Sequence, residues 1–181
     1  MTPALSSVSL RAGAVLILIY PLQSVPHLVL TLRPAHLRRH AGQISLPGGG
    51  YEAGDGTLLT TALRETEEEL GVPREVIDIW GTLDHSVITV SQYQVTPFVG
   101  YAQQRPSFVP DPGEVAEVIE VPLTLLTDAG SLQEELRELS AGARTVSYYP
   151  WGPHKIWGAT ARVLGQLARV LDADARQPLE L

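Results

Sequence analysis

The stretch 62-ALRETEEELGV-72 contains four glutamates within five consecutive positions. The surrounding residues predict a helix over about 57–70, because apolar or methyl-bearing side chains recur at helical spacing along one stripe. Gly71 followed by Pro73 predicts where it ends, since a glycine often closes a helix and proline cannot continue one. The glutamates therefore occupy the last two turns, where the helix dipole favours cations over anions.

Three of these glutamates share one face of the predicted helix. At about 100° per residue, Glu65, Glu68 and Glu69 lie on the same side, and they repel one another at spacings of three and four residues. One arginine, Arg64, stands among them, and it cannot neutralise four acids. A solvated acidic face is one interpretation. Carboxylates crowded at an unfavourable helix end favour the other, a site for hard divalent cations such as Mg²⁺.

The whole chain has the composition of a globular protein. It has 181 residues, of which 44% are hydrophobic and 18% charged, so a single domain over 1–181 is expected. The net charge of −7 argues against nucleic acid or an anionic membrane as a partner. The absence of cysteine excludes disulfides, thiolate catalysis and cysteine zinc sites. The longest apolar run, 12-AGAVLILIY-20, is too short to span a bilayer, so a cytoplasmic location is expected.

Strand and helix patterns alternate along the chain. A short helix is predicted within 127–143, because Ser131 with Glu134 three residues later resembles a capping box. The intermixed elements indicate an α/β layered domain with a mixed sheet, and a frayed tail is expected from about 174 to 181. Strands are predicted at 12–22, 27–33, 76–88, 93–102 and 114–123, with a glycine-rich loop at 43–56 and a last helix at 157–171.

The glycine-rich loop and the acidic helix together resemble the Nudix box, G-x5-E-x7-R-E-U-x-E-E-x-G-U, where U is apolar. Its second half matches from Arg64 to Val72, with Thr66 in place of an apolar residue. In the first half the glutamate position falls on Gly56. If the loop is one residue longer, Gly49 is the glycine of the box and Asp55 stands in for the glutamate.

A second signature lies directly upstream. The stretch 30-LTLRPAHLRRHAGQISLPGG-49 resembles the signature of the coenzyme A pyrophosphatase branch of Nudix hydrolases, with Pro34 and Leu46 as departures. Near the other end, 155-KIWGATARVL-164 looks like the Trp-Gly-x-Thr helix start of that branch, so the resemblance covers about residues 10 to 172. The upstream residues in register are Thr31, Arg33, Arg38, Gly42, Pro47, Gly48 and Gly49.

The resemblance implies a Nudix-type α/β/α sandwich that hydrolyses the diphosphate bond of coenzyme A, using Mg²⁺ or Mn²⁺. It implies 4′-phosphopantetheine and adenosine 3′,5′-bisphosphate as products. The metal ligands would be Glu65, Glu68 and Glu69, and Arg64 would orient them through charge-assisted hydrogen bonds. Glu114 stands where Nudix enzymes often place an additional catalytic carboxylate, although a solvent-facing acid is an equal alternative.

Basic residues of the upstream signature are candidates for substrate binding. Arg33, Arg38, Arg39 and His40 cluster in an otherwise acidic protein, and the planar fork of arginine suits phosphate. The alternative is a salt-bridged loop that shapes the metal site. Gly48 and Gly49 are further candidates for substrate binding. The backbone of Gly48–Gly50 would supply a carbonyl to a metal, as the family implies, or would serve only as a tight turn.

Two other functions stay open on the sequence. One is hydrolysis of a different nucleoside diphosphate, such as ADP-ribose or NADH. The other is a non-catalytic Nudix-like ligand-binding module, against which the intact Glu65, Glu68 and Glu69 speak. The expected partner is a small-molecule substrate rather than nucleic acid or a membrane, and the sequence leaves the oligomeric state open, with a homodimer among the options.

Overall fold

A computed structural model gives the fold and describes residues 10–37, 40–89, 91–128, 130–139 and 142–175. An eight-stranded sheet forms its centre. The strands are β1 (Arg11–Leu22), β2 (Val25–Leu32), β3 (Ile44–Ser45), β4 (Gly48–Gly50), β5 (Asp78–Thr82), β6 (Ser86–Ile88), β7 (Tyr93–Tyr101) and β8 (Glu117–Pro122). The sheet is mixed, because β1 pairs in parallel with β7 and antiparallel with β2 and β4.

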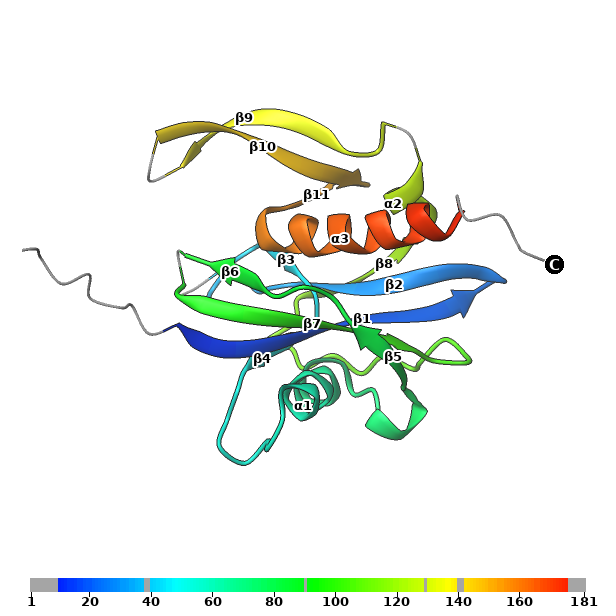
Figure 1. The fold of residues 1–181 in the computed structure, drawn as a ribbon. Coiled ribbons are helices and arrows are strands. Elements are labelled where there is room, and N and C mark those ends of the chain that lie inside the picture. The colour runs from blue at the N-terminus through cyan, green and yellow to red at the C-terminus, as the bar shows by residue number, and fades with distance from the viewer. Residues whose placement is uncertain (1–9, 38–39, 90, 129, 140–141, 176–181) are drawn as a thin grey trace, which may run out of the picture.

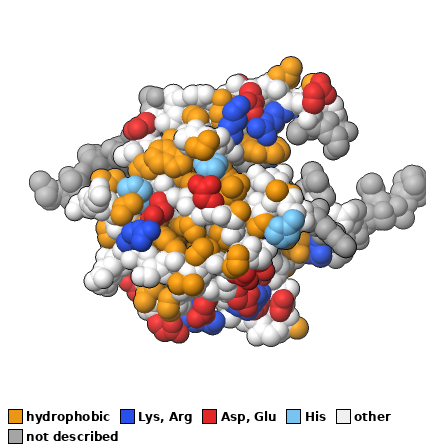
Figure 2. All heavy atoms as spheres, turned by 180° about the vertical axis from the view of Figure 1, so that it is seen from behind, with side chains coloured by type: hydrophobic (Ala, Val, Ile, Leu, Met, Phe, Trp, Pro, Cys, Tyr) orange, Lys and Arg blue, Asp and Glu red, His pale blue; other side chains and the backbone are white. Residues whose placement is uncertain are grey.

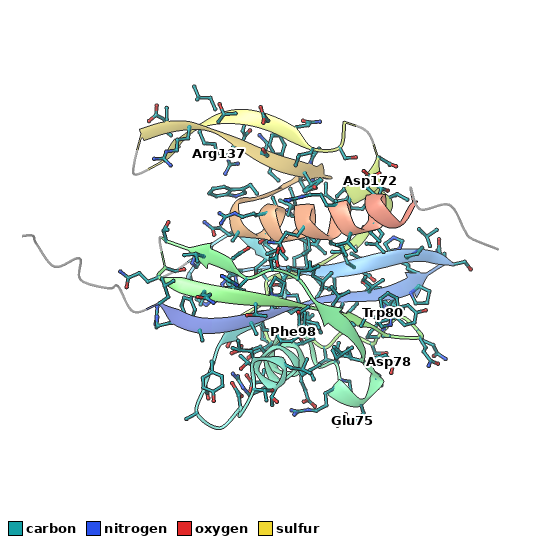
Figure 3. All side chains as sticks on the ribbon, viewed as in Figure 1. Glu75, Asp78, Trp80, Phe98, Arg137 and Asp172 are labelled. Atoms are coloured by element: carbon teal, nitrogen blue, oxygen red, sulfur yellow. The ribbon has the colours of Figure 1, made fainter. Side chains whose placement is uncertain are left out.

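Helices cover both faces of this sheet (Figure 1). α1 (Leu58–Leu70) lies on one face and α3 (Gly158–Ala175) on the other, while α2 (Thr124–Thr127) and the 3₁₀ helix η1 (Arg74–Val76) are short connections. Phe98 of β7 lies between the sheet and α1, in a core that includes Ala62 and Leu70 (Figure 3). The central strand β1 is buried against both helices, which explains its continuous apolar sequence. The predicted α/β/α sandwich with a mixed sheet is confirmed.

A second, three-stranded antiparallel sheet packs beyond α3 and corrects one prediction. It consists of β9 (Gln133–Leu139), β10 (Gly142–Trp151) and β11 (His154–Trp157). The short helix predicted within 127–143 is wrong, because Gln133–Leu139 pairs residue for residue with Gly142–Tyr148 as a hairpin. Cross-strand pairing has overridden the helix propensity of the Glu, Leu and Arg residues in β9.

The boundaries of the other helices and strands differ less from the predicted ones. Thr57 caps α1 by accepting a hydrogen bond from the backbone N–H of Thr60 at 3.1 Å, and Gly71 ends it with a left-handed φ of 66°. The predicted strand at 76–88 is divided between β5 and β6, and the predicted loop at 43–56 contains the short β3 and β4. α3 continues to Ala175, while 176–181 of the expected tail lie outside the described residues. Within the described ranges, no helix is long and apolar enough to cross a membrane.

Candidate active site

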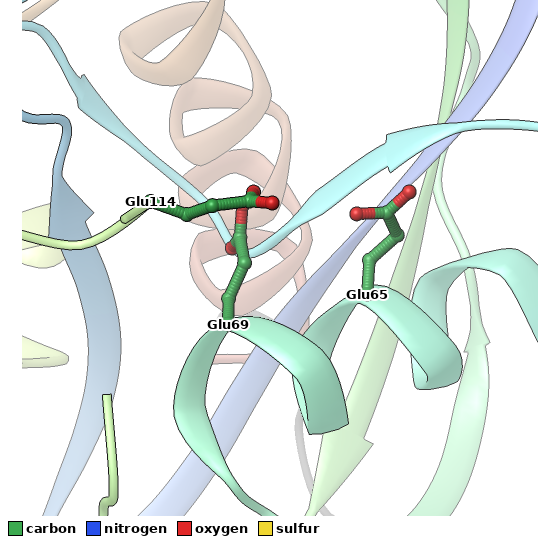
Figure 4. A group of neighbouring side chains, drawn as sticks. All are labelled: Glu65, Glu69 and Glu114. Carbon is green, nitrogen blue, oxygen red and sulfur yellow. The ribbon is translucent and has the colours of Figure 1, made fainter. Parts of the chain in front are cut away.

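Three carboxylates meet beside α1 (Figure 4). Glu65 and Glu69 project from successive turns of the helix, and Glu114 reaches toward them from the segment before β8. One oxygen of each carboxylate lies within 4.8 Å of the other two. The structure therefore brings together two of the three ligands predicted on the helix and adds Glu114, the candidate for an additional catalytic carboxylate.

Glu69 is the most buried member of this carboxylate group, at 1% exposed. Its carboxylate accepts a hydrogen bond from the backbone N–H of Gly48 at 3.3 Å, and Arg33 Nη1 lies 3.6 Å from its other oxygen. Burial raises the pKa of Glu69 to about 8, against the opposing effect of Arg33. The nearby Arg33 does not offset the cost of burying a charge at Glu69, as the raised pKa shows. Carboxylate oxygens in this arrangement fit a divalent cation, which would supply the missing positive charge.

The glycines of β4 allow the backbone to approach Glu65 closely. A Cβ added at Gly49 would lie 2.3 to 2.6 Å from the Glu65 carboxyl atoms, and one at Gly48 would lie 2.3 Å from the carbonyl oxygen of Ala14. Gly48 also has a φ of 148°, which other residues rarely adopt. Burial raises the pKa of Glu65, with Arg64 opposing the shift. Both glycines, predicted as substrate contacts, thus also let β4 fit between β1 and the carboxylate group.

Arg64 is held in place by Asp55. Its Nε and Nη2 donate to the two carboxylate oxygens of Asp55 at 2.7 and 3.2 Å, and Thr61 donates to the same carboxylate at 2.7 Å. Hydrogen bonds from Arg64 and from the backbone of Glu52 keep the pKa of Asp55 well below its usual range. Arg64 Nη2 also lies 3.1 Å from Glu65. This geometry supports Asp55 as the substitute for the glutamate of the box.

Glu68 is placed outside the carboxylate group. It is 57% exposed at the side chain and accepts a hydrogen bond from Arg64 Nη1 at 2.8 Å. The expected convergence of three helix glutamates is therefore replaced by Glu65 and Glu69 with Glu114, and metal ligation by Glu68 stays a prediction. Of the predicted substrate-binding arginines, Arg33 lies beside Glu69, and Arg38 and Arg39 lie outside the described residues.

The segment that delivers Glu114 also caps α1. The backbone N–H groups of Val109 and Asp111 donate to the carbonyl oxygens of Leu70 and Glu69, at 2.8 and 3.0 Å. These carbonyls belong to the last turn, where a helix leaves acceptors without intrahelical partners. Sequence reasoning missed this contact, because a segment without periodicity carries no signal of where its backbone will pair.

Comparisons with known proteins agree with this geometry. A family model described as the NUDIX domain matches residues 10–142. The chain belongs to the Nudix family. A relative from Pectobacterium atrosepticum, named Uncharacterized Nudix hydrolase NudL, is 36% identical over 172 residues, covering 93% of this chain and 87% of the relative. A relative of the same name from Photorhabdus laumondii subsp. laumondii is 38% identical over 144 residues, covering 80% and 76%.

Solved Nudix structures share the fold. RenU, a Nudix hydrolase from M. smegmatis, aligns with a TM-score of 0.58 at 21% identity, covering 94% of this chain and 89% of that one. A MutT protein from Methanosarcina mazei Go1 also aligns with a TM-score of 0.58, at 15% identity, covering 92% and 96%. The family and the sequence relatives together identify a Nudix hydrolase, and the names of the two sequence relatives specify no substrate.

Proposed function

We propose that this Nudix hydrolase cleaves the diphosphate bond of coenzyme A with Mg²⁺ or Mn²⁺, giving 4′-phosphopantetheine and adenosine 3′,5′-bisphosphate. The observation that carries the proposal is the contact between the upstream signature and the carboxylate group. Arg33, which belongs to that signature, lies 3.6 Å from Glu69. The loop that follows it is closed by backbone hydrogen bonds from Arg33 to Gln43 and from Gly42 to Arg33. This supports an arginine-bearing loop beside the reacting diphosphate.

The carboxylate group supplies the ligands for the metal. Glu65, Glu69 and Glu114 would hold the ion, with Glu68 as a further predicted ligand. A bound divalent ion neutralises charge on a diphosphate and lowers the pKa of its bound water. The hydrogen bond from Gly48 fixes one oxygen of Glu69, so the carboxylate is oriented before any ligand arrives.

The surrounding residues hold this arrangement. Asp55 clamps Arg64, and Arg64 in turn holds Glu65 at 3.1 Å, so the orientation of that carboxylate depends on both residues. Arg33, and with it Arg38 and Arg39 of the same signature, would bind phosphate oxygens of the substrate. The negative charge of the substrate would thus be shared between these arginines and the metal ion.

A substrate panel tests the proposal. Purified protein with Mg²⁺ or Mn²⁺ is incubated with coenzyme A, dephospho-coenzyme A, ADP-ribose and NADH, and the products are separated by chromatography. We expect the highest kcat/KM for coenzyme A and the two products named above. The Glu69→Gln protein, purified in parallel, should be inactive and so excludes a contaminating enzyme.

The other outcomes are equally informative. A clear preference for ADP-ribose or NADH would replace coenzyme A by another nucleoside diphosphate. No hydrolysis of any substrate with either metal would contradict the catalytic proposal and favour a ligand-binding module.

A further inference from the structure

A groove of about 470 Å³ lies between β8 and the turn that joins β10 to β11. In the view from behind, hydrophobic side chains gather over the middle of the face, with acidic and histidine side chains among them (Figure 2). The residues that line the groove include Glu117, Ile119, Glu120, Trp151, Pro153 and His154.

One wall of this groove is an open strand edge. β8 pairs with β2 along one side, and among the described residues no backbone hydrogen bond reaches its other side. Unpaired N–H and C=O groups at a strand edge can pair with an added extended chain, whose amides then continue the ladder. The groove therefore offers backbone hydrogen bonds to a ligand that contains amides.

The groove begins close to the carboxylate group. Glu117 opens β8 only three residues after Glu114, which is at most about 10 Å of extended chain. A molecule whose diphosphate lies at Glu114 can therefore extend one end along β8 without crossing the sheet.

The charges of the groove select an uncharged ligand. None of its described lining residues is Arg or Lys, and two are glutamates. Glu120 is bound by Arg105 at 2.7 Å, whereas the ion-pair partner of Glu117 within the described part of the chain is His154 at 3.2 Å. A phosphate or nucleotide phosphate would therefore be repelled from the groove, while the basic side near Arg33 suits it. Trp151, which is half-buried, adds apolar surface for methyl and methylene groups, over the buried Ile119.

We infer that this groove binds the pantetheine arm of coenzyme A, with the arm's two amides pairing with the free edge of β8. The inference rests on the proposed function, because it places the diphosphate at the carboxylate group. The arm is uncharged, extended and rich in methyl and methylene groups, and it starts at the phosphorus next to the bond that is cleaved. Its chemistry thus matches the open edge, the lack of cations and the apolar wall.

A blocking variant tests the groove. Pro153 is exposed on the β10–β11 turn, so Pro153→Trp should fill the groove and leave the carboxylate group untouched. We expect the KM for coenzyme A and dephospho-coenzyme A to rise about tenfold each, which corresponds to the loss of one good contact. The KM or inhibition constant of ADP-ribose, which has no such arm, should not change. Leu136→Trp on β9, 74% exposed and outside the groove, is the matched control.

A direct binding measurement separates the groove from the catalytic proposal. Pantetheine alone is added to metal-free protein and its binding followed by saturation-transfer NMR, where signal is expected for the parent and lost in Pro153→Trp. Pantetheine binding without coenzyme A cleavage would contradict the proposed function but support pantetheine binding in the groove. Coenzyme A cleavage with an unchanged KM in Pro153→Trp would overturn the inference that the groove binds pantetheine, and would support the proposed function. A dimer that Pro153→Trp abolishes would instead assign the groove to a second copy, and would also overturn the inference.

Discussion

Arg64 uses one guanidinium group to contact Asp55, Glu65 and Glu68. Its contacts with Asp55 and Glu65 were predictable, because both follow from positions within the Nudix box. The separation of Glu68 from the carboxylate group was not. At 100° per residue, Glu68 and Glu69 lie about 60° and 40° to opposite sides of Glu65. Sequence periodicity placed both on one face, but the sheet covers only the side of Glu69.

Glu68→Gln separates stability from activity. The variant loses an ion pair with Arg64 and also a repulsion with Glu65, each of a few tenths of a kcal/mol, so the two effects offset. In EDTA we expect the melting temperature to stay within about 2 °C of the parent. With Mg²⁺ we expect turnover to fall more than about tenfold, because Glu68 is a predicted ligand of the ion. Full activity would leave Glu68 as a partner of Arg64 alone.

Glu69 makes the stability of the metal-free protein depend on pH. Burial raises its pKa from 4.5 to about 8, so the folded protein binds this proton more tightly than the unfolded chain. Its stabilising contribution is complete below about pH 4.5 and is lost as the pH rises through about 8. In EDTA the melting temperature of the parent should therefore fall, relative to Glu69→Gln, between these values. Parallel melting curves for the two proteins across that range would contradict the raised pKa.

At the scale of elements, α1 was the most predictable part of the fold. Its apolar stripe, its start near Thr57 and its end at Gly71 all follow from local sequence, and the structure confirms them. The segment from Val109 to Glu114 was not predictable in its position, since it has no periodic pattern. Its backbone caps the end of α1 and so couples the position of Glu114 to the helix that carries Glu69.

Gly71→Ala tests this coupling. A Cβ at Gly71 would lie 2.9 Å from Cβ of Val109 and 3.1 Å from its carbonyl oxygen, at a left-handed φ of 66°. The conformation alone costs about 1–2 kcal/mol, so the melting temperature should fall by roughly 2–8 °C. Displacing Val109 should also move Glu114 and weaken Mg²⁺ binding, measured by calorimetry.

The matched control is Gly54→Ala, because a Cβ there meets nothing within 4 Å and Gly54 is not among the glycines with positive φ. It should leave both stability and Mg²⁺ affinity unchanged or slightly improve stability. If Gly71→Ala melts lower but binds Mg²⁺ like the parent, the cap is structural and does not position Glu114.

At the scale of the whole molecule, the sandwich was predictable and the second sheet was not. Alternating strand and helix patterns, together with the Nudix resemblance, gave the α/β/α layers. The residues of β9 are mostly Glu, Leu and Arg, which favour helix when considered alone. Their extended form comes from pairing with β10, whose inner end is fixed to the core by Tyr149 and by its β11 partner Ile156. Such pairing depends on contacts between distant residues, which local propensity does not contain.

Divalent metal should stabilise the whole fold. Glu65, Glu69 and Glu114 come together in the folded protein only, so a divalent ion bound between them should stabilise the native state by mass action. When the Mg²⁺ concentration is about a hundred times its dissociation constant, the free energy of unfolding rises by about 2.7 kcal/mol, which corresponds to a rise in melting temperature of roughly 5–10 °C.

NaCl at equal ionic strength controls for screening of surface charge. Glu69→Gln should lose most of the Mg²⁺ effect, because the most buried ligand is neutralised. An equal rise in the parent and in Glu69→Gln would place the responsible cation elsewhere on this acidic protein and remove the carboxylate group from the mechanism.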